Sequence, residues 1–151
     1  MKVKGFALSV FLALIAGCAT TQPSDLAAPW INPVQAVQLA ADAAPEGVPG
    51  TFAMRVRAAG TQSGFIYLNS ELDYRDQRNL SIALTAKAAR QLQDQLGSSP
   101  MIALKGKDIL VTGRATRVKI VFYADGKLTD KYYYQTHVRV SDPKQIQLAG
   151  G

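Results

Sequence analysis

The chain has 151 residues, with 17 basic and 11 acidic side chains and a formal net charge of +6. This length is enough for one domain with a real hydrophobic core, but hardly for two. The single cysteine excludes a framework of intrachain disulfides, so packing must hold the fold together. The modest positive charge favours anionic partners without requiring one.

The N-terminal segment is built like a secretory signal. Lys2 and Lys4 precede an apolar run over residues 6–16, and the small residues Ala16 and Gly17 lead directly into Cys18. A spanning helix needs roughly 20 apolar residues, so this shorter run indicates an export signal instead.

The end of this segment, Leu14-Ile15-Ala16-Gly17-Cys18, resembles the lipobox of bacterial lipoproteins. The resemblance implies a signal peptide over residues 1–17, cleavage before Cys18 and a covalent lipid on its thiol, with no other cofactor. Because Ala19 rather than Asp follows the cysteine, it further implies an outer-membrane anchor facing the periplasm. The alternative is an ordinary signal peptide with an incidental cysteine.

Residues 18–31 are polar and contain prolines, which is typical of a tether between an anchor and a domain. Asn32 and Pro33 then suit the cap and first turn of a helix running to Ala41, with an apolar stripe of Val34, Val37 and Leu39. Prolines and glycines over residues 45–50 end this helix.

Five strand-like runs follow. They cover residues 52–59, 65–69, 80–84, 109–123 and 132–140, with a helix over 86–96 that ends at Gly97. A turn is predicted over residues 60–64 and a hairpin turn over 124–127, and Gly113 is expected to form a bulge or kink.

Three strands, a helix and two strands follow the order of an OB-fold, a small Greek-key barrel. Residues 106–113 (GKDILVTG) resemble the opening of the fourth strand in OB-fold domains of the nucleic-acid-binding type, residues 142–146 (DPKQI) resemble their closing motif, and residues 64–69 resemble their second strand. The resemblance implies a mostly β domain over 32–148, a five-stranded barrel with one or two short helices, one of them between strands three and four. In this chain the last two strands extend further outward than in the familiar domains.

The final hairpin is the main candidate binding surface. Period-two sorting places Arg117, Lys119 and Tyr123 on one side of the first strand, and Tyr133, His137 and Arg139 on one side of the second. If these sides coincide, the six residues form one basic-aromatic patch. The strand over residues 65–69 adds Tyr67 and Asn69 to it. The alternative is a solvated outer face with ordinary packing of tyrosines across the strands.

Little in the sequence indicates catalysis. Glu71, Asp73 and Asp76 could hold a hard cation, but arginines lie among them. His137 is the only histidine, which is too few for a usual zinc site, and no nucleophile elbow, P-loop or dinucleotide fingerprint occurs. We therefore expect a protein that is not an enzyme, and a metal-dependent enzyme is the weakest alternative.

These observations predict a lipid-anchored envelope protein whose OB-like domain binds a protein, a glycan or another envelope component. The main alternative is an exported binder of single-stranded nucleic acid or oligosaccharide that uses the basic-aromatic hairpin.

Overall fold

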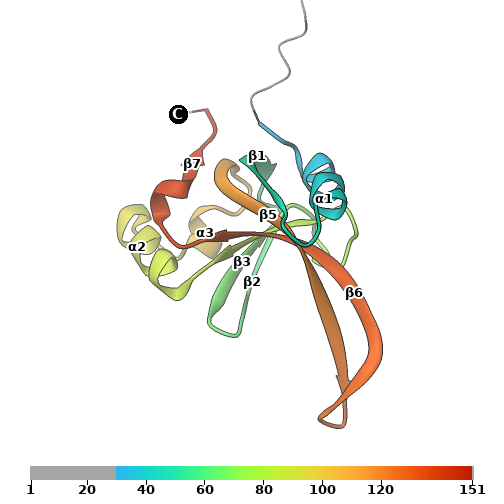
Figure 1. Cartoon of the computed structure of the whole chain (residues 1–151). Helices are drawn as coiled ribbons and strands as arrows, with labels where there is room; N and C mark the ends of the chain where they lie inside the picture. The colour runs from blue at the N-terminus through green and yellow to red at the C-terminus, as the bar shows by residue number, and fades with distance from the viewer. Residues whose placement is uncertain (1–29, 151) are drawn as a thin grey trace, which may run out of the picture.

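A computed structural model of the chain describes residues 30–150 (Figure 1). The predicted signal peptide, Cys18 and almost all of the predicted tether fall outside the described residues. The elements in order are α1 (Pro33–Asp42), β1 (Val48–Arg55), β2 (Ala58–Gln62), β3 (Phe65–Asn69), β4 (Leu80–Leu84), α2 (Ala86–Leu96), α3 (Pro100–Ala103), β5 (Asp108–Ala124), β6 (Lys127–Val140), a 3₁₀ turn (Pro143–Gln145) and β7 (Ile146–Leu148).

The sheet curls into a barrel with the topology expected of an OB-like fold. Its order is β1-β5-β6-β4-β3-β2, with β4 and β6 parallel and the other pairs antiparallel. The strands at the two ends, β1 and β2, are consecutive in the chain. Between them, Val56 donates its N–H to the carbonyl of Lys107, and Arg57 donates to the carbonyl of Asn69. One bent segment therefore bonds in both directions and joins the two ends of the sheet. The predicted mostly β, OB-like fold is confirmed, but the sheet has seven strands and not five, because β1 and β2 are separate strands and β7 is added.

The core follows from strict alternation along the strands. Phe52 and Met54 point inward from β1, Val56 does so just after it, and Ile109 and Val111 point inward from β5. All five residues of β4 are buried, because this strand lies between β6 and β3. Leu80, Ile82 and Leu84 belong to the core, and Ser81 joins a network of buried polar side chains on the other face. Burial of such aliphatic and aromatic side chains, worth about 25 cal/mol per Å², is what stabilises a domain that has no disulfide.

Capping side chains set the starts of the two longer helices, and a glycine ends the second of them. Asn32 and Gln35 form a reciprocal capping box at the start of α1, and Thr85 accepts from the N–H of Ala88 to cap α2. Gly97 ends α2 in the left-handed conformation. The predicted apolar stripe of α1 was wrong.

Ala36 and Ala40 face the core in α1, whereas Val34 and Leu39 are exposed. Small side chains allow this helix to approach the barrel closely. The short helix α3 and the strand β7 were not predicted, since four and three residues carry too little periodicity to be recognised.

Two of the three sequence motifs that resemble the OB-fold, residues 106–113 and 142–146, have clear structural roles. Asp142 caps the 3₁₀ turn, and the Gln145 amide donates to the carbonyls of Thr112 and Arg139, so it ties β5 to β6. Gly113 does not form the expected bulge, since it pairs in regular register with Gly50. A Cβ at Gly113 would lie 2.8 Å from Cγ1 of Val138, so glycine is required there for close packing.

The last hairpin is longer than the sequence indicated. β5 runs to Ala124, and β6 already begins at Lys127, five residues before the predicted start. Asp125 and Gly126 both have positive φ, as a two-residue hairpin turn needs. The register shifts between Val121 and Tyr123, so the irregularity lies near the tip. In Figure 1 the hairpin projects well beyond the barrel, opposite the end where the first described residues lie.

Candidate functional site

A pocket of about 560 Å³ lies on the outer face of the barrel, between the β2–β3 hairpin and the root of the β5–β6 hairpin. This volume falls within the range of small-molecule sites. Its position, over the second and third barrel strands and between the two flanking hairpins, is where OB barrels bind their ligands. The lining residues are Gly60, Thr61, Gln62, Ser63, Tyr67, Asn69, Tyr74, Arg75, Ser81, Ile120, Phe122, Tyr133, Gln135 and His137.

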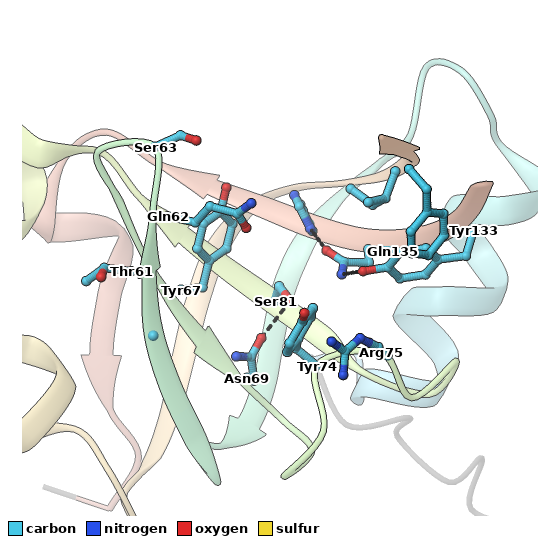
Figure 2. Close-up of a pocket in the computed structure, with 14 residues that line it drawn as sticks. Thr61, Gln62, Ser63, Tyr67, Asn69, Tyr74, Arg75, Ser81, Tyr133 and Gln135 are labelled. Carbon is cyan, nitrogen blue, oxygen red and sulfur yellow. Dashed lines mark hydrogen bonds between the residues drawn. The ribbon is translucent and has the colours of Figure 1, made fainter. Parts of the chain in front are cut away.

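Strand register builds the floor of this pocket. Ser81 on β4 pairs with Asn69 of β3 on one side and with His137 of β6 on the other. The three side chains therefore form a row across neighbouring strands, all on the face opposite the core. Oγ of Ser81 donates to Oδ1 of Asn69 over 2.7 Å, as Figure 2 shows.

A buried polar network supports the floor from one side. The Asn79 amide donates to Oδ1 of Asn69 (3.2 Å), to Oγ of Ser81 (2.9 Å) and to the carbonyl of Tyr74 (3.3 Å). Its oxygen accepts from the N–H of Glu71 over 3.0 Å. Among the described residues, no buried side-chain nitrogen or oxygen lacks a partner. The network fixes the loop over residues 70–79 and, with it, the two pocket residues that the loop supplies.

A second chain of hydrogen bonds runs along β6. Nε2 of His137 and Oε1 of Gln135 are 2.7 Å apart, and Nε2 of Gln135 donates to the Tyr133 hydroxyl over 2.7 Å (Figure 2). With the amide of Gln135 in this orientation, its oxygen accepts from a protonated Nε2 of His137. Nδ1 of His137 is then left as an acceptor, and the Tyr133 hydroxyl proton is left as a donor.

The pocket keeps these groups uncharged. Burial lowers the pKa of His137 from 6.5 to about 4, so its imidazole is neutral at pH 7. Burial also raises the pKa of Tyr133, which keeps its phenol protonated. The groups that face a ligand here are therefore neutral donors and acceptors.

Aromatic rings form the walls. Tyr67 lies 5.5 Å from the His137 ring and 6.1 Å from the Phe65 ring, measured between centroids. Tyr133 lies 5.5 Å from Phe122 on the hairpin side. Such rings offer flat apolar surfaces beside fixed polar groups, which is the usual composition of a site for a small organic ligand.

Charge is sparse in and around the pocket. Arg75 is the only charged lining residue, and its guanidinium lies 4.7 Å from the Tyr74 ring centroid and 3.9 Å from the Asp73 carboxylate. Arg139 projects from the same face of β6 and lies 5.2 Å from the Phe65 ring centroid.

The expected single basic-aromatic patch does not form. The register pairs Lys119 with Tyr134, and Val121 with Tyr132. Directly opposed residues in an antiparallel pair share a face, so Arg117 and Lys119 lie on the side of Tyr132 and Tyr134. His137 and Tyr133 pair with Thr116 and Ile120, on the opposite side.

The structure thus divides the eight candidate residues among three places. Tyr67, Asn69, Tyr133 and His137 line the pocket, and Arg139 lies on the same outer face. Arg117 and Lys119 lie on the other side of the hairpin, and Tyr123 lies near its tip. Gln135, Ser81 and Tyr74 line the pocket but were not among the candidates. Gln135 shares the period-two side of His137 and Tyr133, which was the signal available for it. Tyr74 lies in the loop over residues 71–78, which flanks the expected binding face of an OB barrel, whereas Ser81 carried no signal.

The acidic loop shows no metal geometry. Glu71 pairs with Arg57 (3.1 Å), Asp73 with Arg75 (3.9 Å) and Asp76 with Arg78 (2.7 Å). Hydrogen bonds from Arg78 lower the pKa of Asp76 to about 2. In the part of the chain that the structure describes, no group of three or more His, Cys, Asp or Glu could hold a metal ion, and no helix is long and apolar enough to cross a membrane.

No family model and no curated protein matches this chain. Among solved structures, an aspartyl tRNA synthetase from Entamoeba histolytica is 12% identical with a TM-score of 0.45, covering 97% of this chain and 28% of that one. A putative aspartyl-tRNA synthetase from Leishmania major Friedlin is 13% identical with a TM-score of 0.40, covering 85% and 22%. The chain spans about a quarter of the length of these proteins, and its function is inferred from its own residues.

Proposed function

We propose that this protein is a lipid-anchored envelope protein whose OB-like domain binds a largely uncharged glycan in the outer-face pocket, without catalysis. The observation that carries the proposal is the composition of the pocket: neutral hydrogen-bonding groups on its floor and aromatic rings on its walls. Sugars offer hydroxyl groups to such donors and acceptors, and apolar ring faces to such aromatic surfaces. OB barrels use this face for oligosaccharides as well as oligonucleotides.

The distribution of cations supports an uncharged ligand. A polyanion site needs several cations along the backbone that it binds. Here Arg117 and Lys119 lie on the other face of the hairpin, and Arg75 already faces Asp73. The neutral state of His137 removes the remaining source of positive charge at the centre of the pocket.

The proposal that the pocket is not catalytic rests on the partners of His137. In a catalytic triad the imidazole bonds to a nucleophile on one side and to an orienting carboxylate on the other. His137 instead bonds to Gln135, and no acidic residue lines the pocket. These side chains are suited to recognition.

Co-sedimentation of the full chain, in non-ionic detergent, with purified cell-wall sacculi tests the ligand. Tyr67→Ala removes the central ring and is expected to weaken binding about tenfold or more. Arg117→Ala, on the opposite face of the hairpin, is the matched control and should bind normally. Equal loss in both variants, or no binding by the unmodified chain, would overturn the glycan proposal and favour a protein partner.

The anchor is tested separately. Cys18→Ser removes the only thiol, so the variant should lose the mass of the lipid and leave the membrane fraction. Unchanged mass and unchanged fractionation would contradict a lipid at this position.

Single-stranded nucleic acid is the second candidate. One observation favours it: Phe65, Tyr67 and His137 form an aromatic row that Arg139 flanks. Bases stack on such rings at about 1–3 kcal/mol each. Fluorescence anisotropy of labelled single-stranded DNA over a salt series separates the two ligands, because affinity for DNA must fall steeply with salt whereas affinity for a neutral glycan must not.

A further inference from the structure

The outer half of the β5–β6 hairpin pairs with no other described strand. The pairing of β5 with β1 reaches only Ala115, and that of β6 with β4 starts only at Thr136. Beyond these residues the two strands pair with each other alone. This two-stranded arm is visible in Figure 1 as a twisted ribbon that leaves the body of the domain.

Apolar side chains gather on the exposed part of this arm. Val121, Tyr123, Leu128 and Tyr132 are between 37% and 66% exposed. Register keeps them together, since Tyr123 pairs with Leu128 and Val121 pairs with Tyr132. An exposed apolar cluster of this kind marks a contact surface.

Cations surround this cluster. Residues 117–134 contain four basic side chains (Arg117, Lys119, Lys127 and Lys131) and two acidic ones (Asp125 and Asp130), so the arm carries 4 − 2 = +2. None of the four basic residues forms a salt bridge among residues 30–150. Nζ of Lys119 lies 4.1 Å from the Tyr132 ring centroid, and the Arg117 guanidinium lies 3.7 Å from that of Tyr134.

From this juxtaposition we propose that the arm is a membrane-contact element, which inserts its apolar cluster into the interface of an anionic bilayer while its lysines and Arg117 bind lipid phosphates. Leucine and tyrosine side chains favour the boundary between headgroups and acyl chains, and flanking lysines add attraction to anionic lipids. This site is separate from the pocket, and its ligand is a lipid surface.

Two other occupants fit the arm less well. A soluble polyanion would leave Leu128 and Val121 without an apolar partner, and the cations that lie over Tyr132 and Tyr134 cover ring faces that bases would need. A second copy of the chain, docked symmetrically through this arm, would bring like charges face to face.

A local fluorescence probe on the full chain tests the proposal. Trp30 is the only tryptophan, so Trp30→Phe with Tyr123→Trp places the sole indole in the cluster. The matched control is Trp30→Phe with Ile102→Trp, since Ile102 is 73% exposed on α3, away from the arm. Both variants keep the same N-terminal segment, so any contact that it makes with the bilayer is common to both.

Addition of phosphatidylcholine vesicles that contain phosphatidylglycerol should shift the emission of the indole at position 123 to shorter wavelength, and lipids with brominated acyl chains should quench it. The control indole should respond much less, and pure phosphatidylcholine should act weakly on both. Lys127→Ser with Lys131→Ser, added to the probe variant, should weaken vesicle binding several-fold.

Three results would overturn the proposal: no shift at position 123 with anionic vesicles, an equal shift at position 102, or a response at 123 to single-stranded DNA and not to vesicles. Circular dichroism of each variant shows that the fold is retained. Pocket variants such as Tyr67→Ala should leave this response intact, so the two sites can fail independently.

Discussion

The two faces of the β5–β6 hairpin differ in chemistry although they share one backbone. One face carries Tyr133, Gln135 and His137 into a pocket of neutral hydrogen-bonding groups. The other carries Arg117 and Lys119 over the rings of Tyr134 and Tyr132. Because side chains alternate strictly along a strand, residues that are adjacent in sequence serve separate surfaces. A composition average over this segment would suggest one basic-aromatic surface, whereas the register separates these residues into two surfaces.

Removal of the polar support should affect the pocket face alone and give the largest effect. Asn79→Ala deletes five hydrogen bonds to buried or partly buried groups of the floor and loop, and leaves their partners unsatisfied. We expect a loss of roughly 2–4 kcal/mol in the free energy of unfolding, measured by urea denaturation. Gln77→Ala in the same loop is exposed and serves as the control. Similar losses in both variants would contradict the role of Asn79.

A change at the common root should weaken both faces together. Gly113→Ala places a methyl group 2.8 Å from Cγ1 of Val138. We expect destabilisation of about 1–3 kcal/mol by urea denaturation, as for other overpacked cores. The matched control is Gly60→Ala, because Gly60 has no positive φ and a Cβ there meets nothing within 4 Å. A Gly113 variant as stable as the Gly60 variant would show that the strands can separate without cost.

In mild acid the free energy of unfolding should change through the pocket face alone, where His137 lies. The pKa of His137 is about 4 in the folded protein against 6.5 as its ordinary value, so the unfolded chain binds a proton first as pH falls. The stability that neutral His137 contributes is complete above pH 6.5 and is lost as pH falls toward about 4, by up to roughly 3 kcal/mol. His137 is the only histidine, so His137→Gln should flatten the urea-derived stability profile in this window. An unchanged slope would contradict the assignment.

The cationic face should matter least for folding. Arg117→Ala with Lys119→Ala removes two exposed cation–π contacts, each worth under about 1 kcal/mol at such sites. We expect a nearly unchanged urea midpoint and unchanged ligand binding in the pocket. A large loss of stability, or loss of glycan binding, would show that the two faces are coupled through the strands.

Local chemistry made several elements predictable. The helix over residues 86–96 follows from a threonine cap and a terminal glycine, and the buried β4 follows from its apolar sequence. Both of these features are decided by residues close together in the chain. The OB-like fold was indicated by the order of the strands together with the motifs that resemble those of OB-fold domains.

The composition of the site depended on pairing between distant residues, which the sequence does not encode locally. Period-two reasoning sorted each strand correctly, but only the register shows that Lys119 lies opposite Tyr134 and not beside His137. The role of Ser81 was equally hidden, because it becomes a pocket residue only between Asn69 and His137 on neighbouring strands.

The β-bridge between Ile31 and Phe52 is the first point at which a pulling force on the N-terminal segment would act on the described domain. The N–H of Ile31 donates to the carbonyl of Thr51 over 2.8 Å, and the carbonyl of Ile31 accepts from the N–H of Ala53 over 2.9 Å, in parallel with β1. A pull on the chain before Trp30 therefore shears these two bonds along β1 before it can unwind α1. Since β1 is paired over its full length with β5, the pulling force passes from β1 to β5. β5 is the longest of the described strands, and it carries the force into the root of the hairpin.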